Sequence, residues 1–300
     1  MTARLAQRTH IVARRRRVGL LMTTAMWCAA ALAVLPLVAI LTHVIIGGAS
    51  ALTPAFLIRM PAPAGMGGGG MANAIVGTLL LVLIGSLLGL PVGIGAGLYL
   101  ADRGDARLAT LVRFVADVLS GLPSIVLGIF VWELIVRPSG HFSAFAGGVA
   151  LGLLMVPLVT RATEEMVKLV PRSLVEAALA LGFPQWRTSF VIVLRTAMPG
   201  IMTAVLIAIA RAAGETAPLL FTAFGNAYWS LNPSQPIAAL PLQIFAYAQS
   251  PYDDWHAQAW AGALVLLLLI TLMSVLSRWV LRARHTLMHG TVPRAGVDDG

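Results

Sequence analysis

The sequence predicts an all-α polytopic membrane protein with about six transmembrane helices, and three observations lead to that prediction. Only 11% of the 300 residues are charged, less than half the share that soluble domains carry, and 58% are apolar. Six apolar runs approach or exceed the roughly 20 residues that a helix needs to cross a hydrocarbon core. They lack the alternation of strands, and backbone groups in lipid must be hydrogen-bonded within the chain. The expected spans are 18–46, 73–100, 109–136, 144–161, 197–221 and 257–281.

The placement of the basic residues predicts the orientation of the chain. Eighteen of the 21 lysines and arginines fall in the N-terminal tail, the 101–113 loop, the 161–196 segment or the C-terminal end from Arg278 onward. These are alternate loops, so the positive-inside rule places both termini and the 161–196 segment in the cytoplasm of a multi-pass inner (plasma) membrane protein. The net charge of +9 therefore reflects topology and does not indicate a surface that binds nucleic acid.

The chain begins with a basic cytoplasmic tail, residues 1–17, which should lie on anionic lipid headgroups. The four arginines at 14–17 precede an apolar run, as in a signal peptide, but the run reaches Ile46 and is too long for a cleaved segment. We therefore expect 18–46 to be a retained first transmembrane helix. Cys28 is the single cysteine and lies in this span, so we expect a packing residue and no intrachain disulfide.

Residues 47–72 form an external loop that is rich in Gly and Pro. The glycines within 65–70 lack the Gly-Lys-Ser/Thr of a phosphate-binding loop and follow no strand, so they predict a flexible hinge. Because no other segment offers such a loop, we expect the chain to bind no cofactor and to be no enzyme. If the protein's function depends on ATP-Mg, a partner subunit would have to hydrolyse it.

The remaining five spans occupy 73–281, the expected helical core. The first of them carries a small residue at every fourth position, which predicts a helix-packing seam within this chain or against a partner. These residues are Gly85, Gly89, Gly93 and Gly97. In the following span, Pro123 should kink the helix near its inner half.

Charged residues gather at the ends of the third and fourth spans. Arg113 and Asp117 are four residues apart and so share one helical face. Further pairs one turn apart are Arg161 with Glu165 and Glu164 with Lys168. Two interpretations remain open for Asp117 and the two glutamates: a solvated charge cluster at a helix end, or a gating or coupling role.

The segment at about 168–196 is polar between two apolar runs. Its alanines, among them Ala177 and Ala178, favour a short helix, which Gly182 should end and Pro184 should prevent from continuing. A second helix should then begin at about Trp186. An ordinary linker between spans and a docking element for another protein both fit this pattern.

Arg211 and Glu215 lie in the middle of the fifth expected span. A charge in lipid costs at least a few kcal/mol, so both side chains should face the bundle interior or a wet path. Their spacing places them on one face, and Gly214 and Pro218 should weaken the helix there, as in the broken helices of substrate sites. An Arg–Glu pair that only fixes helix register is the alternative.

The last external loop, 222–256, holds aromatic residues that either anchor the chain at the membrane surface or dock an external protein. A short helix is expected at 240–248, because prolines exclude longer elements elsewhere in the loop. The chain ends in a cytoplasmic tail, 282–300. His285 and His289 in that tail have no neighbouring acidic or cysteine partners, so we expect no metal site.

Four segments resemble known transport motifs. Glu176-Ala177-Ala178, with Gly182 six residues after the glutamate, is similar to the EAA loop of ABC-importer permeases. The others are Arg211-Ala-Ala-Gly-Glu215-Thr-Ala-Pro218, Asp117-Val-Leu-Ser-Gly-Leu-Pro-Ser-Ile and Arg161-Ala-Thr-Glu-Glu165. Together they resemble the PstA-type permeases of phosphate-specific ABC transporters, from about residue 67 to residue 278. One departure is Arg195, which follows Leu194 where the EAA loop usually has proline.

This resemblance implies a type I ABC importer permease fold that translocates inorganic phosphate with energy from a separate ATPase. The implied partners are a sister permease (PstC-like), an ATPase dimer (PstB-like), a periplasmic phosphate-binding protein (PstS-like) and membrane lipid. It implies that the loop with Glu176, Ala177, Ala178 and Gly182 couples the permease to the ATPase. It also associates Arg161, Arg211 and Glu215 with transport.

Physical chemistry is consistent with an anion as cargo. A guanidinium is a permanent cation that binds an oxyanion through two hydrogen bonds. Glu215 would either hold Arg211 in position or accept a hydrogen bond from protonated phosphate. The alternatives are an importer of another oxyanion, such as sulfate or molybdate, an ion-coupled carrier or channel, and a membrane sensor of phosphate.

Overall fold

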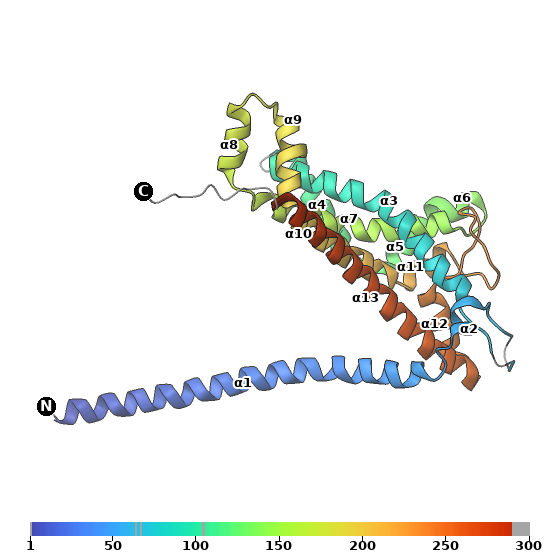
Figure 1. Cartoon of the computed structure of the whole chain (residues 1–300), viewed down its shortest axis with the longest axis horizontal. Coiled ribbons are helices and arrows are strands. Elements are labelled where there is room, and N and C mark those ends of the chain that lie inside the picture. Colours follow the sequence, from blue (N-terminus) through green and yellow to red (C-terminus); the bar gives the residue numbers. More distant parts are fainter. Residues whose placement is uncertain (1, 64, 67, 104–105, 290–300) are drawn as a thin grey trace, which may run out of the picture.

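The computed structural model describes residues 2–63, 65–66, 68–103 and 106–289, with side chains between 14 and 275. Helices make up the regular structure of this part of the chain, as predicted (Figure 1). Helices α1 to α7 are Thr2–Ala49, Pro54–Ile58, Ala72–Asp102, Arg107–Gly121, Ser124–Val131, Arg137–Ser139 and Ala144–Lys168. Helices α8 to α13 are Arg172–Ala180, Gln185–Arg187, Leu194–Ala213, Ala217–Thr222, Leu240–Ala248 and Asp253–His289. Two π-helical turns, Trp132–Val136 and Thr188–Val193, complete the set.

Five helices among the described residues are long and apolar enough to cross a membrane, or six with one bent pair. The bent pair is the third expected span, which the sequence predicted as one kinked helix. It is instead two helices at 107° to each other, α4 and the helix that begins at Ser124. Leu122 and Pro123 are extended between them, because proline lacks an N–H and disfavours helical geometry in the residue before it.

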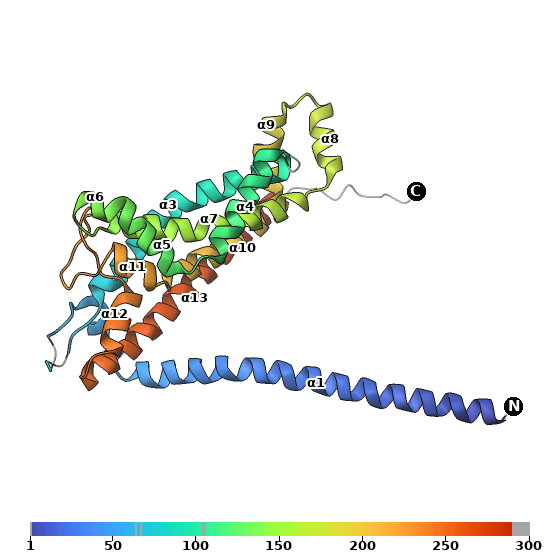
Figure 2. The same cartoon turned by 180° about the vertical axis from the view of Figure 1, so that it is seen from behind.

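Helix α1 extends away from the other helices (Figures 1 and 2). It begins at Thr2 and is continuous through residue 17, so the expected tail and the first span belong to one helix. It meets the rest of the chain near its C-terminal end, where the rings of His43 and Trp260 lie edge to face with centroids 5.5 Å apart. Cys28 is exposed, so the packing role expected for it is not met within this chain.

The core is centred on the pair α3 and α7, which run parallel to each other and pack along the predicted glycine seam. A Cβ on Gly89 would lie 2.6 Å from the backbone oxygen of Gly152, and one on Gly97 would lie 2.5 Å from that of Thr160. Such distances exclude any side chain, so the glycines set how closely α3 and α7 approach. The seam therefore lies within this chain.

One end of the bundle carries α2, α12 and the loops around them. Helix α12 has the bounds expected for the short helix in the last external loop. The sequence predicted a flexible hinge in the glycine run before α3. In the second half of this run the backbone is instead held by close contacts. A Cβ on Gly70 would lie 2.5 Å from the oxygen of Phe56, and the N–H of Gly70 donates to Met60 O at 3.0 Å. Close backbone approach explains this glycine.

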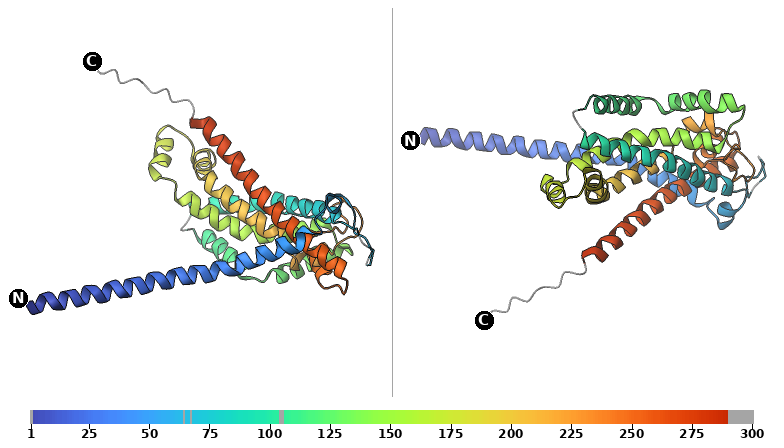
Figure 3. Two further views of the ribbon diagram at one scale, coloured as in Figure 1. Left: turned by 60° about the horizontal axis from the view of Figure 1, so that its bottom comes forward. Right: turned by 90° about the horizontal axis from the view of Figure 1, so that it is seen from above.

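The α8–α9 segment projects from the opposite end of the bundle (Figures 1 and 3). The N-terminal end of α1 points toward the same end. The last helix, α13, continues to His289, past the boundary expected at 281. Residues 290–300 of the expected tail lie outside the described residues, and so do the side chains of His285 and His289.

Candidate functional site

The fifth expected span is broken where its charges lie. Helix α10 ends at Ala213, and α11 begins at Ala217. The N–H groups of Gly214 and Glu215 donate to Arg211 O and Ala212 O at 3.1 and 3.2 Å, which closes the last turn of α10. Pro218 then starts α11, where a missing N–H costs nothing. The predicted weakening of the helix is therefore a complete break.

Arg211 and Glu215 form an ion pair across this break. Arg211 Nε lies 3.6 Å from Glu215 Oε1, and the two side chains are 60% and 18% exposed. The guanidinium thus lies at the surface of this chain and not in the interior of its own bundle. It is a cation with most of its donors open to whatever covers that surface.

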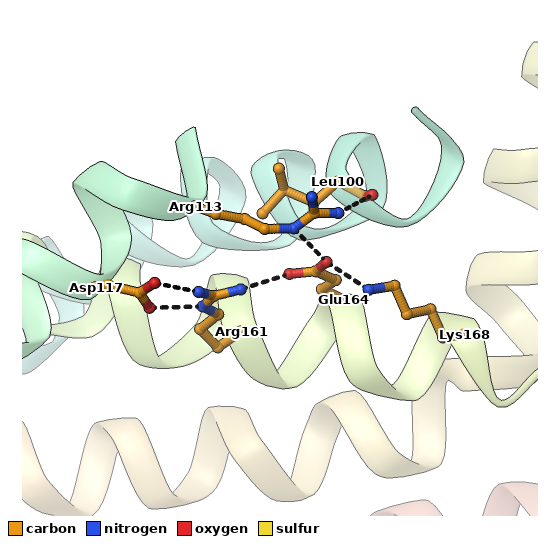
Figure 4. A network of polar contacts seen from close by, with 6 residues as sticks. All are labelled: Leu100, Arg113, Asp117, Arg161, Glu164 and Lys168. Carbon is orange, nitrogen blue, oxygen red and sulfur yellow. Dashed lines mark hydrogen bonds and ion pairs between the residues drawn. The ribbon is translucent and has the colours of Figure 1, made fainter. Parts of the chain in front are cut away.

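Arg161 has a different environment, shown in Figure 4. Its Nε donates to Asp117 Oδ1 at 2.9 Å, Nη2 donates to Asp117 Oδ2, and Nη1 donates to Glu164 Oε2 at 3.1 Å. The pair predicted with Glu165 is wrong, because Glu165 is exposed and the nearer acid on the buried face is Glu164. The predicted pair of Glu164 with Lys168 is confirmed at 2.6 Å.

Glu164 is the centre of this network. Its side chain is 3% exposed and accepts hydrogen bonds from Arg161, Lys168 and Arg113, the last at 2.8 Å. Arg113 also donates from Nη2 to Leu100 O at 3.1 Å. No partner for Arg113 was predicted from the sequence. A signal was nevertheless present, because Arg113 lies one turn before Asp117, and this spacing places both side chains on the face of α4 that meets α7.

The predicted EAA-type helix is present as α8. Gly182 has a φ of +83°, a left-handed conformation that ends the helix, and Phe183 N–H donates to Ala178 O at 3.2 Å. Glu176 and Ala177 are exposed, whereas Ala178 is buried. The tip presents Leu181 and Trp186, which are 79% and 66% exposed.

The opposite end holds a cavity of about 620 Å³ beside α12. Tyr247 and Trp255 stack in its wall with ring centroids 4.4 Å apart, and Tyr228 is 81% exposed at its edge. Burial raises the pKa of the Tyr247 phenol above its ordinary value. The two interpretations of the aromatic residues, membrane anchoring and docking of an external protein, both remain compatible with this site.

Comparisons with known proteins give a consistent picture. Residues 89–285 match the family described as "Binding-protein-dependent transport system inner membrane component". The chain is 48% identical over 243 residues to the phosphate transport system permease protein PstA of Yersinia pestis, covering 81% of this chain and 82% of that one. It is 49% identical over 233 residues to PstA of Xylella fastidiosa strain Temecula1, covering 77% and 79% of the two chains.

A solved structure of similar shape is an inward-facing conformation of the MetNI methionine ABC transporter. The TM-score is 0.55 at 21% identity, and the match covers 71% of this chain and 94% of that chain. At this identity the likeness supports the fold alone. The ABC importer permease architecture expected from the sequence is therefore confirmed by an independent comparison of shape.

Proposed function

The chain belongs to the PstA-type phosphate permeases within the family of binding-protein-dependent transport system inner membrane components, and from this premise we propose that Arg211 guides inorganic phosphate across the membrane. The protein is the membrane permease subunit of an ATP-driven importer. The observation that supports the site is an exposed guanidinium at a complete break in an apolar helix. Broken helices of membrane transporters characteristically line substrate paths.

A sister permease (PstC-like) would cover the surface on which Arg211 lies. The path would then run between the two subunits, where the guanidinium is both shielded from lipid and accessible to an anion. This arrangement accounts for an arginine that is 60% exposed in one chain of an otherwise apolar protein. The energetic cost of placing Arg211 in lipid makes a lipid-facing position unfavourable.

Coupling to ATP would occur through α8. An ATPase dimer (PstB-like) hydrolyses ATP-Mg and receives the exposed tip of the α8–α9 segment, around Leu181 and Trp186. A periplasmic phosphate-binding protein (PstS-like) would deliver cargo at the end of the bundle with α12. Alternating access follows if closure of the ATPase dimer moves α8 and thereby the helices that line the path.

The experiment that tests the site compares two arginines of this chain. Arg211→Gln in the assembled complex, reconstituted in vesicles, should abolish ATP-dependent phosphate uptake without loss of any subunit. Arg137→Gln is the matched control, because Arg137 also forms an exposed i,i+4 pair, with Glu133. Equal uptake by Arg211→Gln and wild type would remove Arg211 from the path.

The same vesicles separate the alternative functions. Uptake without the ATPase subunit would indicate an ion-coupled carrier or channel. Sulfate or molybdate can also be added to compete with the uptake of labelled phosphate. If either anion inhibits uptake at the same concentration as unlabelled phosphate does, the cargo is another oxyanion. We expect neither, because the relatives with nearly half their residues identical are phosphate transport permeases.

A further inference from the structure

The apolar contacts of α4 with the rest of the chain are small. Five of its large apolar side chains are exposed, with values of 45–64%, Val112 and Leu119 are half-buried, and the side chains it buries fully are alanines, Ala109 and Ala116. The exposed set is Leu108, Leu111, Phe114, Val115 and Val118. This limited burial of apolar surface contributes little free energy, so apolar packing alone does not explain what holds α4 in place. The bend of 107° at Pro123 also removes support from a continuous helix.

Charged side chains join α4 to its neighbours (Figure 4). Arg113 joins three helices, because its guanidinium donates both to Glu164 on α7 and to Leu100 O near the C-terminal end of α3. One turn further along α4, Asp117 receives two hydrogen bonds from Arg161. Two parallel hydrogen bonds fix the relative orientation of two groups, which a single contact between exposed charges does not.

Arg161 is poorly placed to receive an anion. Asp117 accepts from its Nε and Nη2, and Glu164 accepts from its Nη1, so two carboxylates already take three of the five N–H donors of this guanidinium. An oxyanion that approached Arg161 would find few open donors and would be repelled by both carboxylates. Arg211, by contrast, has one acid at 3.6 Å and is 60% exposed. The two arginines therefore have different tasks.

The network lies at the base of α8. Lys168, which donates to Glu164, is the last residue of α7, and α8 starts at Arg172. The short connection is anchored, because Val167 and Val170 are both buried in the main hydrophobic cluster. A displacement of α8 must therefore act first on this turn of α7 and on the carboxylate of Glu164.

We propose that Arg161 is a positioning residue which, with Asp117, Glu164 and Arg113, holds α4 to α7 so that α4 moves together with the coupling helix α8. This proposal rests on the proposed transport function and deepens it, since it assigns Arg161 to coupling and leaves the anion to Arg211. Glu164 is the common acceptor that keeps three cations of the network together.

The decisive experiment replaces the ion pair of Arg161 and Asp117 with an apolar contact between the same two positions. Replacing an ion pair with apolar residues of similar size commonly preserves packing. Arg161→Met alone should lower the uptake of phosphate by the assembled complex at least about tenfold, because α4 loses its support. The double variant Arg161→Met with Asp117→Leu should regain uptake to within about threefold of wild type.

Two results would overturn the proposal. One is a double variant that assembles but stays as inactive as Arg161→Met, which would mean that a cation at 161 is itself required. The other is normal uptake by Arg161→Met. If the double variant fails to assemble, Asp117→Asn decides: it keeps Arg161 charged, and we expect it to lose uptake, so normal uptake by Asp117→Asn refutes the proposal.

A readout without phosphate separates this proposal from the proposed function. In a Cys28→Ser background, spin labels at Leu111 on α4 and Ser173 on α8 report the distance between the two helices. This distance should stay constant when ATP is added to the wild-type complex and should change in Arg161→Met. A distance that changes in the wild type contradicts the proposal even if phosphate is transported, and failure of the wild type to import phosphate contradicts only the function.

Discussion

At the residue scale, the neighbours of a side chain decide its role more than its type does. Arg161 and Arg211 are the two arginines within the long helices that the family resemblance associates with transport. The acids around Arg161 use its donors, whereas Arg211 keeps most of its surface open. A guanidinium binds oxyanions well only where such donors are available. The exposed arginine is therefore the candidate for the path.

Glu215 gives a prediction that depends on the chemistry of the cargo. If its carboxylate accepts a hydrogen bond from protonated phosphate, Glu215→Gln should slow uptake by roughly tenfold to a hundredfold, since hydrogen bonds to charged groups contribute about 1.5–3 kcal/mol. The preference for phosphate over sulfate should narrow, because sulfate has no proton to donate at neutral pH. Initial rates of uptake of the two anions measure both effects.

Glu133→Gln is the control for this variant, because Glu133 is the exposed partner of Arg137 in the other i,i+4 pair. It should leave both the rate and the preference unchanged. Normal uptake by Glu215→Gln, with unaltered rejection of sulfate, would refute the role as a hydrogen-bond acceptor. The pair would then serve to position Arg211 or to fix helix register.

At the element scale, the α3–α7 seam shows how a periodic sequence becomes a rigid contact. The four glycines recur on one face. At Gly89, Gly93 and Gly97 the partner helix lies too close for a Cβ, and at Gly85 a Cβ would lie 3.0 Å from Leu151 Cβ. Small residues allow this approach, and the resulting van der Waals contacts hold membrane helices together where the hydrophobic effect cannot.

The seam yields a pair of variants on one helix. Gly89→Ala should destabilise the purified permease in detergent by about 1–3 kcal/mol, because its Cβ would lie 2.6 Å from Gly152 O. Gly95→Ala, which meets nothing within 4 Å, should be neutral or stabilising by about 0.5–1 kcal/mol. Thermal unfolding followed by circular dichroism measures both. Equal Tm values for the two variants would contradict a tight seam.

The third expected span shows that an apolar run in the sequence does not determine whether a helix is continuous. The run 109–136 is apolar enough for one span, yet Leu122 and Pro123 divide it with a bend of 107°. A proline permits a kink or a break, and the outcome depends on contacts far along the chain. Here the helix after the bend packs on α11, where a Cβ on Gly128 would lie 2.6 Å from Pro218 Cα.

At the scale of the whole molecule, the α8–α9 segment and the N-terminal end of α1 lie toward one end, and the aromatic loops lie toward the other (Figure 3). This arrangement agrees with the alternation of basic and neutral loops in the sequence. It does not by itself say which end is cytoplasmic, so the orientation stays a prediction of the positive-inside rule.

Cysteine labelling tests that orientation. In a Cys28→Ser chain, Ser173→Cys on α8 should react with a membrane-impermeant maleimide only after the cells are permeabilised. Ser234→Cys, in the last external loop, should react in intact cells once the outer permeability barrier is open to the reagent. Both positions are exposed in the structure, so access to each side of the membrane determines the result. The reverse pattern would overturn the coupling role of α8.

Much of the fold followed from local rules. The apolar runs indicated the spans, Gly182 and Pro184 indicated the end of α8, and prolines confined α12 to its observed bounds. The candidate site was only partly predictable, since i,i+4 spacing identified Glu164 with Lys168 but wrongly joined Arg161 to Glu165. Asp117 and Arg161 are 44 residues apart, and their contact depends on how α4 crosses α7.

The sequence by itself determined that this chain is a helical membrane permease with a charged pair inside an apolar run and a short polar helix between two spans. Composition, periodicity and helix-ending residues act locally, so they can be read along the chain. Only the tertiary structure decided which arginine is enclosed by carboxylates and which remains open, because helix crossings bring distant charges together or keep them apart.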